Sequence, residues 1–123
     1  MILSVGEALI DLIHSPGRHE PRAQVGGSPL NVSVALARLD ITSGFVCPIS
    51  KDKYGQLIYA HLQQNNVQQC MTTLVDDPTA IAEVFTDSSG HPRYVFHRNE
   101  TADRALHQSP PITAISAVGH AKL

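Results

Sequence analysis

The sequence predicts an α/β fold with a small antiparallel appendage, and three observations support this prediction. Short apolar runs typical of strands alternate with segments whose apolar residues recur at helical spacing. Turn residues separate the last two strand-like runs, as in a β-hairpin. The resulting order of strand, strand, helix, strand, helix, hairpin and helix favours a sheet covered by helices. The expected strands are 2–6, 8–14, 44–49, 80–87 and 93–99, and the expected helices are about 28–39, 55–65 and 113–122.

The second apolar run, ALIDLIH at 8–14, is interrupted by Asp11. A carboxylate inside an apolar strand is costly unless it has partners. Asp11 therefore either faces water on a half-exposed strand or binds two adjacent hydroxyls of a ligand with its two oxygens. The stretch that follows, SPGRHEPRA at 15–23, has two prolines, a glycine and charges, and it predicts a loop.

Residues at the ends of the first two expected helices predict where those helices begin and end. Ser28 is expected to cap the first helix, and Pro29 suits its first position. After this helix Asp40 takes a place where glycine is usual, because Asp tolerates the left-handed conformation better than most residues. Asp52 is the expected N-cap of the second helix.

Gly26 and Gly27 immediately precede the N-terminus of the first expected helix, and Asn31 lies one turn into it. Glycine lets a ligand approach the backbone, and a helix N-terminus has free N–H groups. Neither of the phosphate motifs G-x-x-x-x-G-K-[ST] and G-x-G-x-x-G is present. A polar ligand held by the backbone and by the Asn31 amide fits the pattern, since an amide both donates and accepts. An ordinary turn, with Asn31 bonded locally, is the alternative.

Composition narrows the class of protein. The 123 residues suffice for one domain, 42% are apolar and 16% charged, and the net charge is −2. This balance gives no reason to expect nucleic acid or an anionic membrane as a partner. The apolar N-terminus carries Glu7 and Asp11 and no basic residue, so neither a signal peptide nor a membrane span is expected, and a cytoplasmic protein is the default.

Cysteine and histidine usage predicts no metal site and no disulfide scaffold. Cys47 lies in a strand-like run and is expected to be a small buried side chain, and no C-x-x-C motif occurs. The seven histidines include the loose pairs His14 with His19 and His91 with His97. Without cysteines or an H-E-x-x-H motif nearby, these pairs predict scattered histidines rather than metal ligands.

Three segments together carry a resemblance to a known family: GEALIDLI at 6–13, GGSPLNVSVALARLD at 26–40 and FHRNETAD at 96–103. In this order and spacing they resemble the N-terminal part of the PfkB/ribokinase family of carbohydrate kinases, in its fructokinase-like branch. The resemblance covers nearly the whole chain, 1–123. It implies a Rossmann-like ribokinase fold, incomplete here, with a small β-lid over the sugar built from parts of about 8–25 and 80–99.

The resemblance also implies roles for individual residues. Asp11, Gly27 and Asn31 match family positions that hold sugar hydroxyls, and Arg98 matches an arginine near the substrate. ATP and Mg²⁺ are the implied cofactors, a small sugar is the implied substrate, and a homodimer through the lid is the implied assembly. Departures from the family pattern at Asp40, Ser50, Glu100 and Thr101 leave local turn geometry and the identity of the sugar open.

The family's late D-T-x-G-A-G-D segment, which supplies the general base and a helix N-terminus for the developing charge, has no match in this sequence. We therefore expect the N-terminal, sugar-binding portion of an ATP-dependent kinase for a fructose-like sugar, without catalytic or ATP-binding residues and inactive by itself. The alternative is a truncated fragment or a sugar-binding remnant without enzymatic activity.

Overall fold

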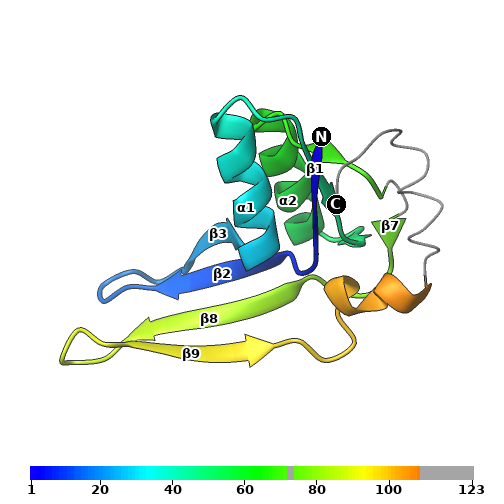
Figure 1. Cartoon of the computed structure of the whole chain (residues 1–123). Helices are drawn as coiled ribbons and strands as arrows, with labels where there is room; N and C mark the ends of the chain where they lie inside the picture. The colour runs from blue at the N-terminus through cyan, green and yellow to red at the C-terminus, as the bar shows by residue number, and fades with distance from the viewer. Residues whose placement is uncertain (72–73, 109–123) are drawn as a thin grey trace.

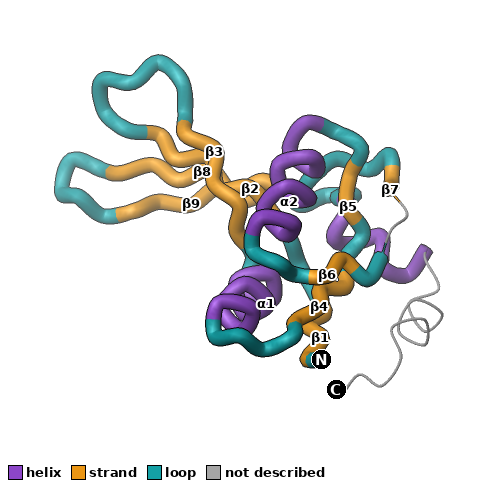
Figure 2. The backbone as a smooth tube through the Cα atoms, turned by 90° about the horizontal axis from the view of Figure 1, so that it is seen from above, coloured by secondary structure: helices purple, strands orange, loops and turns teal. Residues whose placement is uncertain are grey.

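The computed structural model describes residues 1–71 and 74–108, and it contains a helical body and an extended arm (Figure 1). The body has a parallel sheet, the body sheet, in the order β1-β4-β6. Helices α1 and α2 lie on one side of this sheet (Figure 2). Its elements are β1 (Ile2–Val5), α1 (Ser28–Arg38), β4 (Ser43–Val46), α2 (Lys53–Gln64) and β6 (Gln68–Gln69).

A second sheet, the arm sheet, has four strands in the order β3-β2-β8-β9. The pairs β2–β3 and β8–β9 are antiparallel, while β2 and β8 run parallel. Both views show these strands projecting away from the helices (Figures 1 and 2). The strands are β2 (Leu9–His14), β3 (Arg22–Gly26), β8 (Ala80–Thr86) and β9 (Pro92–His97). Two short strands, β5 (Ile49–Ser50) and β7 (Leu74–Val75), pair separately, and a 3₁₀-helix, η1, covers Ala102–Gln108.

The main hydrophobic core lies between the body sheet and the two helices. Phe45 of β4, Leu30 of α1, and Ile58 and Leu62 of α2 meet there, and none is more than 2% exposed. Burial of each such side chain stabilises the fold by about 1.5–3 kcal/mol. Ile10 of β2 is fully buried in the same cluster, so the arm sheet is fixed to the body at the base of β2.

Most predicted elements are present, with differences that have physical reasons. Residues 22–26 form β3, so the expected loop at 15–23 is wrong for its last two residues: pairing with β2 makes a strand of a segment without strong strand propensity. The expected strand at 44–49 is divided between β4 and β5 at Pro48, which has no N–H for a ladder. The helix η1 was not predicted, and the helix expected at 113–122 lies outside the described residues.

The helix ends confirm two of the predicted caps and correct one. Asp40 adopts φ +60° after α1, as expected of the left-handed position. The Asp52 side chain accepts a hydrogen bond of 2.8 Å from the Gly55 N–H, as an N-cap does. The expected Ser28 cap is wrong: Gly27 is the N-cap of α1, with φ +112°, and no side chain caps this helix.

Candidate functional site

One face of the arm sheet carries a row of residues that crosses all four strands. Asp11 of β2 pairs with Gln24 of β3 and with Ala82 of β8, and Ala82 pairs with Phe96 of β9. Directly paired residues project to the same face of a sheet. Ala82 is small and buried, whereas the Phe96 side chain is 60% exposed. This face of the sheet therefore presents the carboxylate of Asp11, the amide of Gln24 and the exposed aromatic ring of Phe96.

The carboxylate of Asp11 lies directly against the backbone of Gly26. A Cβ atom at Gly26 would lie only 2.5 Å from Asp11 Oδ2, so the glycine makes room for this carboxylate. The Asp11 side chain forms no hydrogen bond or ion pair with any described residue, and partial burial raises its pKa. Both of its oxygens are available to accept hydrogen bonds from a ligand.

Gly27 joins β3 to α1 through a conformation that other residues rarely adopt. Its φ is +112°, and a Cβ there would lie 2.6 Å from the backbone oxygen of Glu7. The carbonyl of Gly27 accepts the first helical hydrogen bond, 2.9 Å long, from the Asn31 N–H. The helix N-terminus is thus set beside two acceptors, the Glu7 carbonyl and the Asp11 carboxylate. Such surroundings suit hydroxyl donors and oppose a phosphate group.

Arg98 is held between two carboxylates just beyond the end of β9. Its Nη1 lies 2.8 Å from Glu7 Oε2, and its Nη2 donates to Asp103 Oδ2 at 2.6 Å. The hydrogen bond to Asp103 is the main reason why the pKa of Arg98 is raised further. Thr101 Oγ1 donates to the other Asp103 oxygen at 2.6 Å. The guanidinium is therefore fixed in place, and its buried Nε lacks a partner among the described residues.

Glu7 contacts two of the residues predicted from the sequence, Gly27 and Arg98. Its backbone oxygen lies beside Gly27, and its carboxylate binds Arg98. Gly27 in turn follows Gly26, which contacts Asp11. Sequence reasoning singled out Arg98 but missed Glu7 and Asp103 as its partners. Glu7 lies in the motif GEALIDLI and Asp103 lies in the motif FHRNETAD, which also contains Arg98. An acidic residue in each motif is the signal that could have indicated partners for the arginine.

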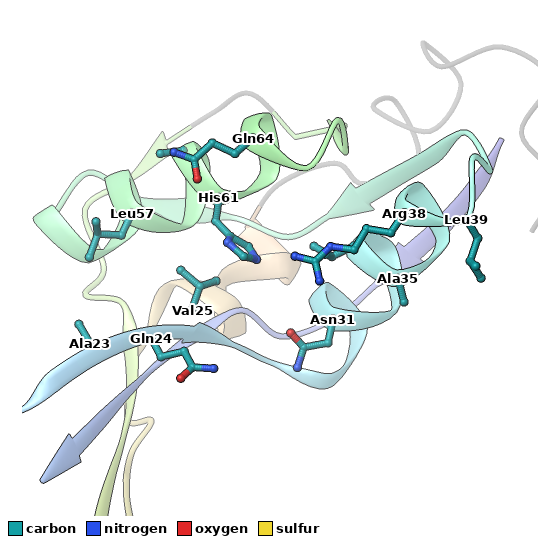
Figure 3. Close-up of a pocket in the computed structure, with 12 residues that line it drawn as sticks. Ala23, Gln24, Val25, Asn31, Ala35, Arg38, Leu39, Leu57, His61 and Gln64 are labelled. Atoms are coloured by element: carbon teal, nitrogen blue, oxygen red, sulfur yellow. The ribbon is translucent and has the colours of Figure 1, made fainter. Parts of the chain in front are cut away.

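Asn31 is exposed on α1 and lines a groove of about 840 Å³ between α1, α2 and β3 (Figure 3). The amide groups of Asn31 and Gln24 point toward one another at one end of this groove. The Asn31 side chain forms no hydrogen bond with any described residue, so the local bonding considered from the sequence is not observed. Arg98 lines a different hollow of about 520 Å³, together with Phe96. Asp11 and Gly27 line neither of these two hollows.

The described part of the chain contains no group of three or more histidine, cysteine or acidic side chains arranged to hold a metal ion. His14 and His97 instead flank Glu83, at 3.1 and 2.8 Å from its two oxygens. Cys47 is fully buried as expected, and burial, as the main cause, raises the pKa of its thiol to about 12.

Within residues 1–71 and 74–108, no helix is long and apolar enough to cross a membrane.

Comparison with known proteins identifies the family. Residues 1–123 match the sequence model of the family described as pfkB family carbohydrate kinase. The chain belongs to this family. Fructokinase-1 of Oryza sativa subsp. japonica is 33% identical over 113 residues, which cover 86% of this pfkB chain and 35% of the relative. The predicted resemblance to the fructokinase-like branch is thereby confirmed.

Solved structures confirm the predicted fold class of this pfkB chain. The crystal structure of fructokinase from Xylella fastidiosa superposes with a TM-score of 0.76 at 31% identity, over 83% of this chain and 34% of that one. A second structure of fructokinase from the same organism contains bound ATP, and it matches with a TM-score of 0.73 at 30% identity, over 83% of this chain and 34% of that one. The pfkB chain thus spans about a third of the length of these relatives.

Proposed function

We propose that this chain is the sugar-binding part of an ATP-dependent carbohydrate kinase that acts on a fructose-like sugar. The observation that carries the proposal is the contiguity of Asp11, Gly27, Asn31 and Arg98 through Gly26 and Glu7. These groups come from three separate segments of the chain, and they present acceptors and an amide near the N-terminus of one helix.

Each group has a role that suits a sugar. The two oxygens of Asp11 accept hydrogen bonds from neighbouring hydroxyls, and the Asn31 amide accepts from one hydroxyl while donating to another. Gly27 lets the sugar ring approach the backbone. The exposed ring of Phe96, on the same face as Asp11, covers the apolar C–H face of the sugar. Arg98, which is fixed by Glu7 and Asp103, limits the size of the ligand accepted beside the end of β9.

ATP and Mg²⁺ do not fit the residues described here. The glycine-led helix N-terminus of α1 lies beside the Glu7 carbonyl and the Asp11 carboxylate, which oppose a phosphate group. The sequence also contains no D-T-x-G-A-G-D segment. In our proposal the nucleotide, the metal and the general base belong to a part of the kinase fold that this sequence does not contain. The 123 residues alone then bind sugar without turning it over, which is also what a non-enzymatic sugar-binding remnant would do.

We assign the arm sheet to the lid expected over the sugar, because its strands, except for Gly26 at the end of β3, fall within the predicted segments of about 8–25 and 80–99. The outer strand β9 exposes Tyr94, Val95 and Phe96. An exposed edge strand with apolar side chains favours pairing with another chain, so we propose that the lid also mediates a homodimer. The net charge of −2 gives no basis for binding nucleic acid, and we propose a cytoplasmic location.

A chimera tests the proposed function. Residues 1–123 replace the matching third of the Xylella fastidiosa fructokinase, and fructose phosphorylation is measured. We expect activity, and we expect Asn31→Ala to raise the KM for fructose about tenfold by removing hydrogen bonds to the sugar. The neighbouring Val32→Ala, also on the exposed side of α1, is the matched control and should leave KM unchanged. If the chimera is active and Asn31→Ala leaves its KM for fructose unchanged, the site assignment is wrong.

A further inference from the structure

The groove between α1 and α2 has a cationic end that the proposed sugar site does not use. Arg38 of α1 and His61 of α2 both line this groove, and their side chains point toward one another (Figure 3). Among the described residues that line the groove, none is acidic. Two nitrogen-rich side chains therefore face the same space without a counter-charge from the groove wall.

Arg38 is held in position by the end of α2. Its Nε donates to Asn65 Oδ1 at 3.1 Å, and the Asn65 amide donates to the His61 carbonyl at 2.8 Å. This chain of contacts fixes the guanidinium relative to His61 and uses only one of its N–H groups. The terminal N–H groups of Arg38 have no hydrogen-bond or ion-pair partner within the described residues, so they remain available to an acceptor in the groove.

We propose that this end of the groove binds the phosphate group of a small phosphate ester between Arg38 and His61. A guanidinium donates two parallel hydrogen bonds to a phosphate, which is why arginine is common in phosphate sites. Ala35 and Ala60 also line the groove, and their small side chains leave room between the helices. The floor includes Val25 and Val34, which suits the carbon skeleton of an ester. Asn31, which the proposed sugar site uses, lines the same groove, but this proposal uses only Arg38 and His61 as ligands and does not depend on sugar binding.

The charges around His61 support an anionic ligand rather than a neutral one. Burial, and then the nearby Arg38 charge, lower the pKa of His61. The other polar groups facing the groove, Gln24, Asn31 and Gln64, carry no charge. A bound phosphate would offset the Arg38 charge and favour the imidazolium, so binding should be coupled to proton uptake by His61.

The test is a titration of the 123-residue chain with inorganic phosphate and, separately, with a hexose monophosphate. The imidazole signals of His61 are followed by NMR and affinity by calorimetry, with sodium chloride at equal ionic strength as the reference. We expect saturable binding that shifts the His61 signals and raises its pKa. Arg38→Gln should weaken binding at least about tenfold, since a charge-assisted hydrogen bond is lost. Arg18→Gln, in the exposed loop before β3, is the matched control.

Each outcome decides the proposal. Binding of both probes, or of the ester alone, with dependence on Arg38 supports it, and the comparison shows whether free phosphate or an ester is the ligand. A His61→Gln variant that also loses affinity by calorimetry adds support without relying on the histidine signal. Responses no larger than those to chloride, or unchanged in Arg38→Gln, overturn it.

Discussion

The carboxylate of Asp11 and the backbone of Gly26 are in such close contact that a methyl group at position 26 has no space. The added Cβ would lie 2.5 Å from Asp11 Oδ2 and 3.3 Å from Leu9 Cδ1. Leu9 is almost fully buried, so of these two side chains only Asp11 has freedom to move. The glycine therefore determines where the Asp11 carboxylate lies on the arm sheet.

Gly26→Ala should displace the Asp11 carboxylate and weaken fructose binding. In the fructokinase chimera we expect the KM for fructose to rise about tenfold, because the hydrogen bonds accepted by Asp11 lose their geometry. The rate at saturating fructose should change less. Steady-state kinetics over a range of fructose concentrations measures both quantities.

The control for this substitution is Gly90→Ala, in the turn between β8 and β9. Gly90 has φ +84° with open space around it, so alanine there adds backbone strain and touches nothing. Both variants lose some stability, but only Gly26→Ala should affect KM. Equal KM values for the two variants would show that Asp11 does not bind the sugar.

Arg98→Gln should destabilise the fold, because it leaves the Asp103 carboxylate, 2% exposed, without its cation. Removing one partner of a buried ion pair costs about 3–5 kcal/mol. Since the Arg98 side chain is 27% exposed, we expect the lower part of that range or somewhat less, measured as the free energy of unfolding in urea. Arg93→Gln removes an exposed arginine that lies over the Phe85 ring, and should cost less than about 1 kcal/mol. Similar losses for the two variants would contradict this account.

Asp52→Ala should loosen the junction between α2 and the arm sheet. One Asp52 oxygen accepts from the Gly55 N–H and the Thr79 hydroxyl, and the other accepts from the Thr79 N–H at 2.9 Å. Loss of an N-cap costs about 1 kcal/mol, and the bonds to Thr79, which precedes β8, add to it. We expect about 2 kcal/mol in urea unfolding at pH 7. Asp76→Ala, which breaks only an exposed ion pair with Lys51, should cost less than about 1 kcal/mol.

The effect of Asp52→Ala should depend on pH. Burial, the largest single influence, favours the neutral acid, but the hydrogen bonds from Thr79, Gly55 and Ser50 together outweigh it and lower the pKa of Asp52. A carboxylate with a lowered folded-state pKa stabilises the fold above its ordinary value of 3.8 and loses that contribution as pH falls through the folded value. The difference in the free energy of unfolding between wild type and Asp52→Ala should therefore shrink in acid. A difference that stays constant from pH 7 to pH 3 would contradict this prediction.

Local signals predicted the local structure well, because they act within a few residues. The left-handed Asp40 and the Asp52 cap each depend on one side chain and its own backbone. The strand β3 escaped prediction because its residues become a strand only by pairing with β2. Ser28 could have capped α1, but the close approach of the Glu7 backbone requires the glycine conformation at Gly27, and the helix begins one residue earlier.

In the candidate site, too, single residues could be predicted from the sequence but their contacts with distant residues could not. Asp11, Gly27, Asn31 and Arg98 were predicted from motifs, whereas their grouping depends on Glu7, whose backbone and side chain face different partners. The groove beside Asn31 also depends on contacts that no motif encodes. Arg38 and His61 are 23 positions apart in the numbering of the chain, and they face one another only because α1 and α2 lie on the two sides of one groove.

On the face of the arm sheet opposite Asp11, Glu83 connects three strands. His14 of β2 lies 3.1 Å from one Glu83 oxygen and His97 of β9 lies 2.8 Å from the other. The hydrogen bond with His97, followed by that with His14, lowers the pKa of Glu83. Glu83→Gln should therefore lower the melting temperature at neutral pH, since the amide carries no charge and offers only one acceptor oxygen.

The stabilisation by Glu83 should be lost in acid. Its contribution is fully present above the ordinary glutamate pKa of 4.5 and disappears as pH falls through the lower value of the folded state. Melting curves of wild type and Glu83→Gln should converge as pH falls below the ordinary value of 4.5, while hydrogen exchange at neutral pH should show faster opening of β9 in the variant. Glu20→Gln, in the exposed loop before β3, should match wild type at every pH. If Glu83→Gln also matches wild type at pH 7, the two histidines do not join the strands through Glu83.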